Sequence, residues 1–110
     1  MSQRVAKVES VILQAVASGL RELLDGGDAA AVTVTRVDAA PDLRNATVWV
    51  GLLGDAEAQA RLWTRISGLQ GGLQASLRDK FTMKFVPRLH LRHDTGGEYA
   101  AEIDRLLKGL

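Results

Sequence analysis

The sequence predicts a two-layer α+β fold in which helices cover one face of a three-stranded sheet. Apolar residues first recur every three or four positions over a long N-terminal stretch, which is the spacing of one helix face. Three later stretches alternate apolar and polar residues, as half-buried strands do, and a second helical pattern separates the last two of them. With 110 residues and no linker-like tract, the chain fits one domain covering residues 1–110.

The first element is a helix from Arg4 to Leu24, whose apolar stripe includes Val8 and Ile12. Ser2 is positioned to act as its N-cap, because a serine oxygen can accept a hydrogen bond from the first-turn amides. The glycines of "DGGD", which follow the stripe, are expected to end the helix.

Two strands follow and form a hairpin. "AAVTVTRVD" is rich in β-branched residues, and its alternation places Val32 and Val34 on one face and Thr33, Thr35 and Val37 on the other. "NATVWVGLL" repeats the alternation. The connection "AAPDLRN" predicts a longer loop instead of a two-residue turn, because its proline fixes φ and its aspartate can bond nearby amides.

Asp55 is positioned to cap a second helix, whose apolar spacing continues almost unbroken to Phe81. Gly68, Gly71 and Gly72 lie inside this pattern. Each interior glycine costs about 1 kcal/mol relative to alanine. Three of them so close together predict a kink in the helix or its division into two.

The third strand, "TMKFVPRLHLRHD", is predicted to carry basic side chains on one face. Its apolar side holds Phe85, Leu89 and Leu91, and its other side holds Lys84, Arg88, His90 and Arg92. Pro87 cannot donate a ladder hydrogen bond, so the strand is expected at a sheet edge or a bulge. "EYAAEIDRLLKGL" predicts a final short helix.

Composition narrows the classes of function. The chain has no cysteine, which excludes thiol catalysis, disulfides and Cys-based metal sites and favours a reducing cytoplasm. Charged residues interrupt the N-terminal apolar pattern, so we expect no signal peptide, and no apolar run approaches the length of a membrane span. The pattern is typical of a soluble cytoplasmic protein.

The net charge of +1 is uninformative, but its distribution along the chain is not. The stretch 61–92 holds seven basic residues and one acidic residue, Asp79, whereas the remainder is acidic overall. Such segregation predicts a surface for a polyanion if the fold brings the cations together.

Three segments, in this order and at these separations, resemble ribosome-binding factor A. They are "RVAKVESVILQAVASGLRELL" at the start, "VTVTRVDAAPDLRNATVWVGLLGD" across the hairpin and "GGLQASLRDKFTMKFVPRLHLRHD" leading into the third strand. The most specific pieces are Arg4-Val5-Ala6, Val-Thr-Val-Thr leading to Pro41-Asp42-Leu43, and Val86-Pro87-Arg88-Leu89 followed by Asp94. The resemblance covers essentially the whole chain.

The resemblance implies a KH-like fold of the type II order and a bacterial cytoplasmic factor that binds the free, immature small (30S) ribosomal subunit and its rRNA. It also implies a role in late maturation and 5′-end processing of small-subunit (16S) rRNA, a link to growth in the cold, and no catalytic activity. No cofactor, metal, membrane or small-molecule substrate is expected, and the protein is expected to be a monomer.

The predicted RNA contacts are mostly cations. They are Arg61, Arg65, Arg78, Lys80, Lys84, Arg88 and Arg92 in the basic stretch, Arg4 and Lys7 on the first helix, and Arg44 in the hairpin loop. "GLQG" matches the Gly-x-x-Gly loop with which KH domains clamp a nucleic-acid backbone. The resembled family replaces that loop with a kink at an Ala-x-Gly element, which aligns with Gln70, Gly71 and Gly72 here. Those glycines are expected to expose amides to phosphate or to serve helix packing, and the two roles are compatible.

Two other functions stay open at this point. One is a protein–protein adaptor that uses a sheet edge for strand addition, without RNA binding. The other is a small hydrolase that uses His90 or His93, although residues three apart on a strand point to opposite faces. Of the two tryptophans, Trp63 is expected to be buried and Trp49 to cover part of the sheet rather than stack on a base.

Overall fold

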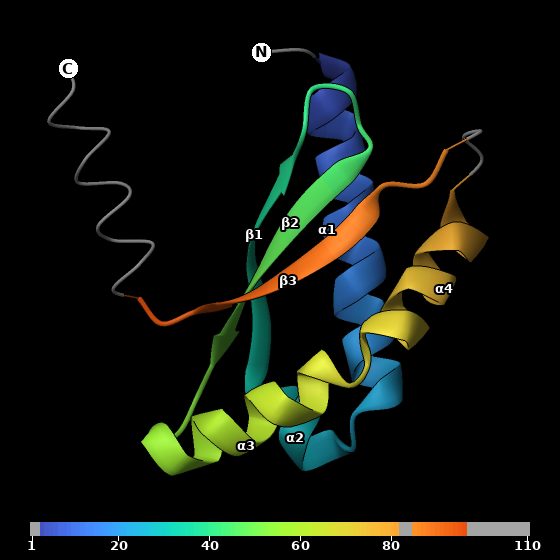
Figure 1. The fold of residues 1–110 in the computed structure, drawn as a ribbon. Coiled ribbons are helices and arrows are strands. Elements are labelled where there is room, and N and C mark those ends of the chain that lie inside the picture. The colour runs from blue at the N-terminus through green and yellow to red at the C-terminus, as the bar shows by residue number, and fades with distance from the viewer. Residues whose placement is uncertain (1–2, 82–84, 97–110) are drawn as a thin grey trace, which may run out of the picture.

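The computed structural model describes residues 3–81 and 85–96. Along the chain the elements are α1 (Gln3–Leu23), α2 (Gly26–Ala30), β1 (Val32–Ala39), β2 (Asn45–Leu52), α3 (Ala56–Ser67), α4 (Gln70–Lys80) and β3 (Arg88–Asp94) (Figure 1). This order confirms the sequence prediction, except that α2 was not expected. The predicted N-cap Ser2, Lys84 and the helix over 98–110 lie outside the described residues.

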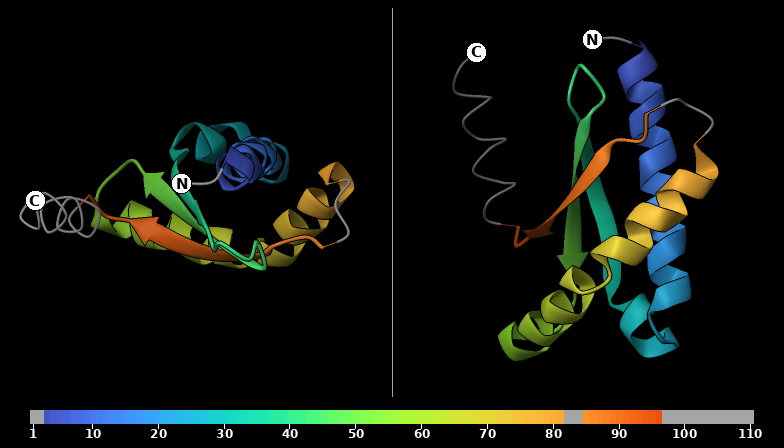
Figure 2. Two further views of the ribbon diagram at one scale, coloured as in Figure 1. Left: turned by 90° about the horizontal axis from the view of Figure 1, so that it is seen from above. Right: turned by 45° about the vertical axis from the view of Figure 1, so that its right-hand side comes forward.

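The three strands form one mixed sheet in the order β1-β2-β3, with β1 antiparallel and β3 parallel to β2. Figure 2 shows α1 on one side of this sheet, with α4 crossing α1, while α3 runs across one end of the strands. The α+β prediction is therefore confirmed. Because β3 lies at an edge and begins directly after Pro87, the prediction from that proline is confirmed as well.

A β-bulge at Thr35 corrects the predicted faces of β1. Val34 pairs with Val50, but the register then shifts, and Val37 pairs with Val48. The extra residue reverses the alternation, so Val37 joins Val34 on the core face and is only 8% exposed. Strict period-two counting assigned Val37 to the opposite face because the sequence carries no sign of the bulge.

One apolar core joins the helices to the inner face of the sheet. Ile12 of α1, Val48 of β2, Ile66 of α3, Leu77 of α4 and Leu89 of β3 are all fully buried. Each such side chain contributes about 1.5–3 kcal/mol by leaving water. The amphipathic helices and alternating strands of the sequence thus meet in a single cluster.

Two glycines allow α1 and α4 to cross closely. A Cβ built on Gly19 would lie 2.8 Å from Cδ2 of Leu73, and one on Gly72 would lie 3.2 Å from Cδ1 of Leu23. The first distance is shorter than any ordinary carbon contact. Gly72 therefore has a packing role, which was one of the two interpretations of the glycine cluster.

The predicted division of the second helix occurs at Gly68 and Leu69, between α3 and α4. Gly68 has φ −71° and ψ −14°, so the break requires no left-handed backbone. Gly71 and Gly72 lie in the first turn of α4. The "GLQG" segment consequently forms a short helix break, and the Gly-x-x-Gly match does not produce an extended loop.

The hairpin loop confirms the expected wide connection. Asp42 Oδ1 accepts a hydrogen bond from the Arg44 amide at 3.0 Å, and the Leu43 amide donates to the Ala40 carbonyl at 2.8 Å. Leu43 has φ 61°, a conformation that leucine rarely adopts, yet its side chain is only 7% exposed. Burial of Leu43 therefore offsets backbone strain in the loop.

The side chain of Phe85 departs from its predicted apolar face. It is 66% exposed, whereas Leu89, which the alternation placed with it, is fully buried. Regular strand pairing starts only at Arg88, after Pro87, so the period-two pattern does not extend back to Phe85.

Candidate nucleic-acid interface

A groove between α4 and β3 gathers four of the predicted RNA contacts. It has a volume of about 600 Å³ and is lined by Gln70, Gly71, Gln74, Arg78, Val86 and Arg88. The sequence predicted Gln70, Gly71, Arg78 and Arg88 for an RNA site, but not Gln74 or Val86. We call this site the α4–β3 groove. The two arginines are exposed and come from opposite walls, so a polyanion in the groove would meet positive charge on both sides.

Two glutamines of α4 hold the free edge of β3. Gln70 Nε2 donates to the Leu89 carbonyl at 2.6 Å. Gln74 Nε2 donates to the Pro87 carbonyl at 2.9 Å, and Gln74 Oε1 accepts from the Leu89 amide at 2.9 Å. Spaced four residues apart on one helix face, the glutamines supply the partners that a fourth strand would otherwise provide. They fix the width of the α4–β3 groove.

The first turn of α4 faces this groove at Gly71. Its N-cap, Leu69, makes no side-chain capping bond, and the first i→i−4 bond of the helix runs from the Leu73 amide to the Leu69 carbonyl. Nothing lies within 4 Å of a Cβ built on Gly71. Gly71 is exposed and lines the groove, so the positively polarised first turn of α4 borders it, while Gly72 packs on α1.

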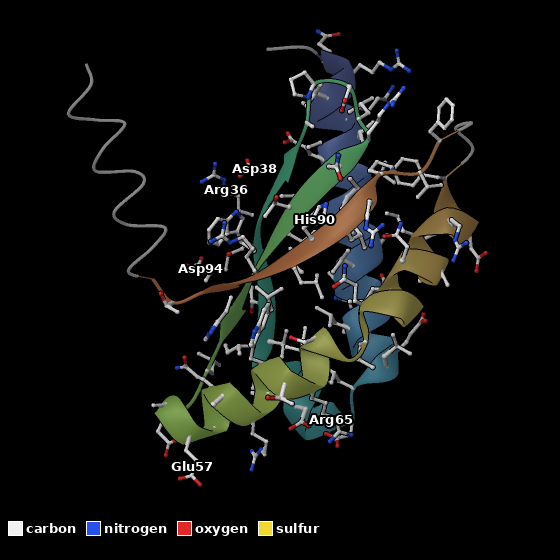
Figure 3. The ribbon with its side chains drawn as sticks, in the orientation of Figure 1. Arg36, Asp38, Glu57, Arg65, His90 and Asp94 are labelled. Carbon is white, nitrogen blue, oxygen red and sulfur yellow. The ribbon has the colours of Figure 1, made fainter. Side chains whose placement is uncertain are left out.

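Other cations of the basic stretch lie elsewhere. The guanidinium of Arg65 on α3 lies 3.5 Å from the Asp28 carboxylate and 4.0 Å from that of Asp25. Arg65 lies beside α2, at the bottom of the view in Figure 3. Arg61 is also exposed on α3, and Lys80 is exposed at the end of α4. The guanidinium of Arg92 lies 4.9 Å from the ring centroid of Trp49. The basic stretch thus does not form one continuous patch within the described residues.

A second groove brings together Arg4 of α1 and Arg44 of the hairpin loop. It has a volume of about 460 Å³ and is lined by Arg4, Val5, Pro41, Asp42, Leu43, Arg44 and Phe85. We call it the α1–hairpin groove. Lys7 is exposed one turn along α1 from Arg4. Phe85 and Val86 line different grooves, so the short segment before β3 separates the two sites.

The two histidines point to opposite sides of the sheet, as their spacing predicted. His90 Nε2 lies 2.8 Å from Asn45 Oδ1, and His93 stacks on Trp63 with ring centroids 5.5 Å apart. Trp63 is partly buried and Trp49 is 7% exposed. Across residues 3–81 and 85–96, no group of three or more His, Cys, Asp or Glu side chains could hold a metal ion.

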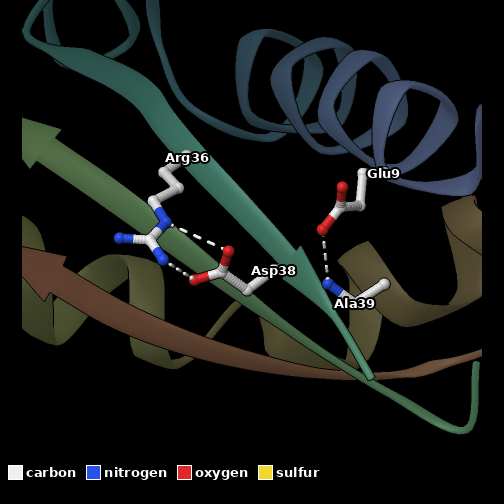
Figure 4. Close-up of polar contacts among 4 residues, drawn as sticks. All are labelled: Glu9, Arg36, Asp38 and Ala39. Atoms are coloured by element: carbon white, nitrogen blue, oxygen red, sulfur yellow. Dashed lines mark hydrogen bonds and ion pairs between the residues drawn. The ribbon is translucent and has the colours of Figure 1, made fainter. Parts of the chain in front are cut away.

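Both edges of the sheet are partly occupied by side chains from the helices. Glu9 of α1 accepts a hydrogen bond from the Ala39 amide of β1 at 2.9 Å, close to an Arg36–Asp38 pair with an N–O distance of 2.8 Å (Figure 4). The glutamines of α4 occupy the other edge. Within the part of the chain that the structure describes, no helix is long and apolar enough to cross a membrane.

The fold and the groove together define a class of protein. The helix, hairpin, broken helix and parallel third strand form a KH-like fold of the type II order, and the α4–β3 groove lies beside its helix break. The sequence model of ribosome-binding factor A matches residues 4–107. The chain belongs to the ribosome-binding factor A family.

Individual relatives agree with this assignment. The ribosome-binding factor A of Geobacter sulfurreducens is 34% identical over 77 residues, which cover 70% of this chain and 65% of that protein. The crystal structure of the Thermus thermophilus factor superposes with a TM-score of 0.67 and 24% identity, covering 81% of this chain and 93% of that one. A homology model of the Thermus factor, fitted into a cryo-EM map of a 30S complex, has a TM-score of 0.61 and 24% identity over 80% of this chain and 92% of that one.

Proposed function

We propose that this protein binds the free small (30S) ribosomal subunit through its rRNA and assists late maturation and 5′-end processing of 16S rRNA. Family membership and the 30S complex of the Thermus factor support the partner. The α4–β3 groove is the structural feature that best supports contact with RNA. Arg78 on α4 and Arg88 on β3 both line it, and Gly71 in the first turn of α4 lines it as well.

The mechanism follows from binding alone. Guanidinium groups and helix N-termini bind phosphate oxygens, and such contacts position a protein on RNA without reading its sequence. A protein that prefers one conformation of immature rRNA shifts the population toward it. It dissociates when maturation removes that preference. In this proposal the chain acts as a single, monomeric KH-like domain in the cytoplasm, with no enzymatic step and no cofactor.

The adaptor alternative has less support. Strand addition needs a row of unpaired backbone groups at a sheet edge. Here Gln70 and Gln74 already bond the backbone of β3 at Pro87 and Leu89, and Glu9 bonds the edge of β1.

Salt dependence of 30S binding tests the RNA contact. The logarithm of the binding constant falls linearly with the logarithm of the salt concentration, and each neutralised phosphate steepens this fall by about 0.7 on a single strand and about 0.9 on duplex DNA. Replacing Arg78→Gln and Arg88→Gln together should make the fall shallower by about 1.4–1.8 and weaken binding at every salt concentration. Arg65→Gln is the matched control, since Asp28 already pairs with that cation, and it should leave the slope unchanged.

A sucrose gradient of cell lysate supplies the test of the partner. The wild-type chain should travel with free 30S particles and be absent from 70S ribosomes. Migration with soluble complexes that survive nuclease treatment would contradict the proposal and select the adaptor. Full affinity in the double arginine variant would remove the α4–β3 groove from the interface.

A further inference from the structure

The α1–hairpin groove differs in composition from the α4–β3 groove. Its lining includes three apolar residues, Val5, Pro41 and the buried Leu43, together with Phe85, which is 66% exposed. A volume of about 460 Å³ falls within the range of about 300–1,000 Å³ that small-ligand sites occupy. An aromatic ring in a lining with apolar residues suits a planar ligand.

Charge further restricts the ligand. Arg4 comes from α1 and Arg44 from the hairpin loop, so two cations from separate elements line the same groove. Asp42 is the acidic residue of the lining, and its Oδ1 already accepts the Arg44 amide at 3.0 Å within the loop. A planar ring system attached to phosphate matches this combination of aromatic surface and guanidinium groups.

The positions of both sides of the groove are held by the fold. The Arg88 amide donates to the Arg44 carbonyl at 2.9 Å, which joins the hairpin loop to the start of β3. Pro87 is fully buried, and its carbonyl is bonded by Gln74. Phe85 therefore lies two residues ahead of an anchored point, and the Arg44–Arg88 connection leads directly into the α4–β3 groove.

We propose that the α1–hairpin groove binds one unpaired nucleotide of RNA, with its base stacked on Phe85 and its phosphates on Arg4 and Arg44. The inference rests on the proposed function and specifies its substrate as single-stranded RNA. Proteins that read unpaired RNA stack its bases on aromatic side chains, whereas a duplex keeps its bases inside and offers nothing to an exposed phenylalanine. An RNA strand would cross from phosphate contacts in the α4–β3 groove to the stacked base.

The test uses the full chain and two RNA probes with about the same number of phosphates, an unstructured strand of two dozen nucleotides and a duplex of a dozen base pairs, titrated by fluorescence anisotropy. Phe85→Ala should weaken single-strand binding by roughly 10- to 100-fold, the usual effect of losing a stacking platform. Its salt slope should stay unchanged, because the phenyl ring contacts no phosphate. Phe85→Trp should restore binding, since it returns an aromatic surface.

Leu53→Ala is the matched control, because Leu53 is 68% exposed and lines neither groove, and it should bind both probes like the wild type. Replacing Arg4→Gln and Arg44→Gln together should make the fall of single-strand affinity with salt shallower, by about 1.4 in the slope of log K against log salt. Circular dichroism confirms that each variant is folded.

Equal single-strand affinity in Phe85→Ala and the wild type overturns the nucleotide site, as does a wild-type chain that prefers the duplex. Either result leaves the proposed function intact if the protein still travels with free 30S particles. Loss of that migration in the wild type would refute the proposed function instead.

Discussion

Replacing Gln74 by alanine should lower the free energy of unfolding by about 2 kcal/mol. The change removes two hydrogen bonds, from Nε2 to the Pro87 carbonyl and from the Leu89 amide to Oε1, both at 2.9 Å. A hydrogen bond contributes about 0.5–1.5 kcal/mol net, and an amide left without an acceptor costs about 1–3 kcal/mol. The better helix propensity of alanine returns only a few tenths of that.

Two related variants each test a single hydrogen bond along the same edge of β3. Gln70→Ala removes one hydrogen bond, at 2.6 Å to the Leu89 carbonyl, and should cost about 1 kcal/mol. Gln74→Glu keeps an acceptor for the Leu89 amide but cannot donate to the Pro87 carbonyl, so it should fall between alanine and the wild type. Gln14→Ala, at an exposed position of α1, is the matched control and should change stability by less than about 0.5 kcal/mol.

Urea unfolding followed by circular dichroism measures these differences. With an m-value of about 2 kcal/mol/M, a loss of 2 kcal/mol moves the midpoint down by roughly 1 M while m stays constant. A midpoint for Gln74→Ala within error of the Gln14→Ala control would refute the reasoning. It would mean that water replaces the glutamine at no cost and that α4 does not hold the edge of β3.

Two further predictions concern the packing and the ends of the helices. Gly19→Val should lower the stability of the protein to heat by about 1–3 kcal/mol, because its Cβ would lie 2.8 Å from Leu73. Gly71→Ala, where the space is open, should leave the stability unchanged or raise it by up to about 1 kcal/mol. Equal melting temperatures for these two variants would contradict the proposed close crossing. Asp55→Ala should lower the free energy of unfolding by about 1 kcal/mol, since Asp55 Oδ1 accepts a hydrogen bond from the Ala58 amide at 2.8 Å. Asp55→Asn keeps an acceptor and should retain most of the stability. Equal losses in both variants would exclude the cap as the cause.

Much of the fold could be predicted because short sequence patterns specify where helices and strands begin and end. The cap at Asp55, the division near Gly68 and the edge position after Pro87 each depend on residues within a few positions of one another. The face of the sheet predicted for Val37 was wrong because a bulge depends on how two strands pair, and the alternation within one strand does not reveal it. Gln74 looked like an ordinary surface residue, because its partners are thirteen and fifteen positions away.

The candidate site was likewise predicted only where neighbouring residues define it. The sequence concentrated positive charge between residues 61 and 92, yet it could not say that Arg78 and Arg88 face one groove while Arg65 pairs with Asp28. Charges at similar sequence separations can converge or be neutralised, depending on where helices and strands direct them. Alternation placed Phe85 on the apolar side of the third strand, and only the tertiary structure revealed that it is exposed and lines the same groove as Arg4.

By itself, the sequence determined the strands, most of the helices and their order, because backbone preferences and apolar periodicity act over a few neighbouring residues. Its resemblance to known motifs, rather than these patterns, indicated the family. The tertiary structure alone decided which cations remain available to RNA and which side chains line the two grooves. Those outcomes depend on contacts between residues far apart in the chain, and such contacts exist only after the core has brought α1, α4 and β3 together.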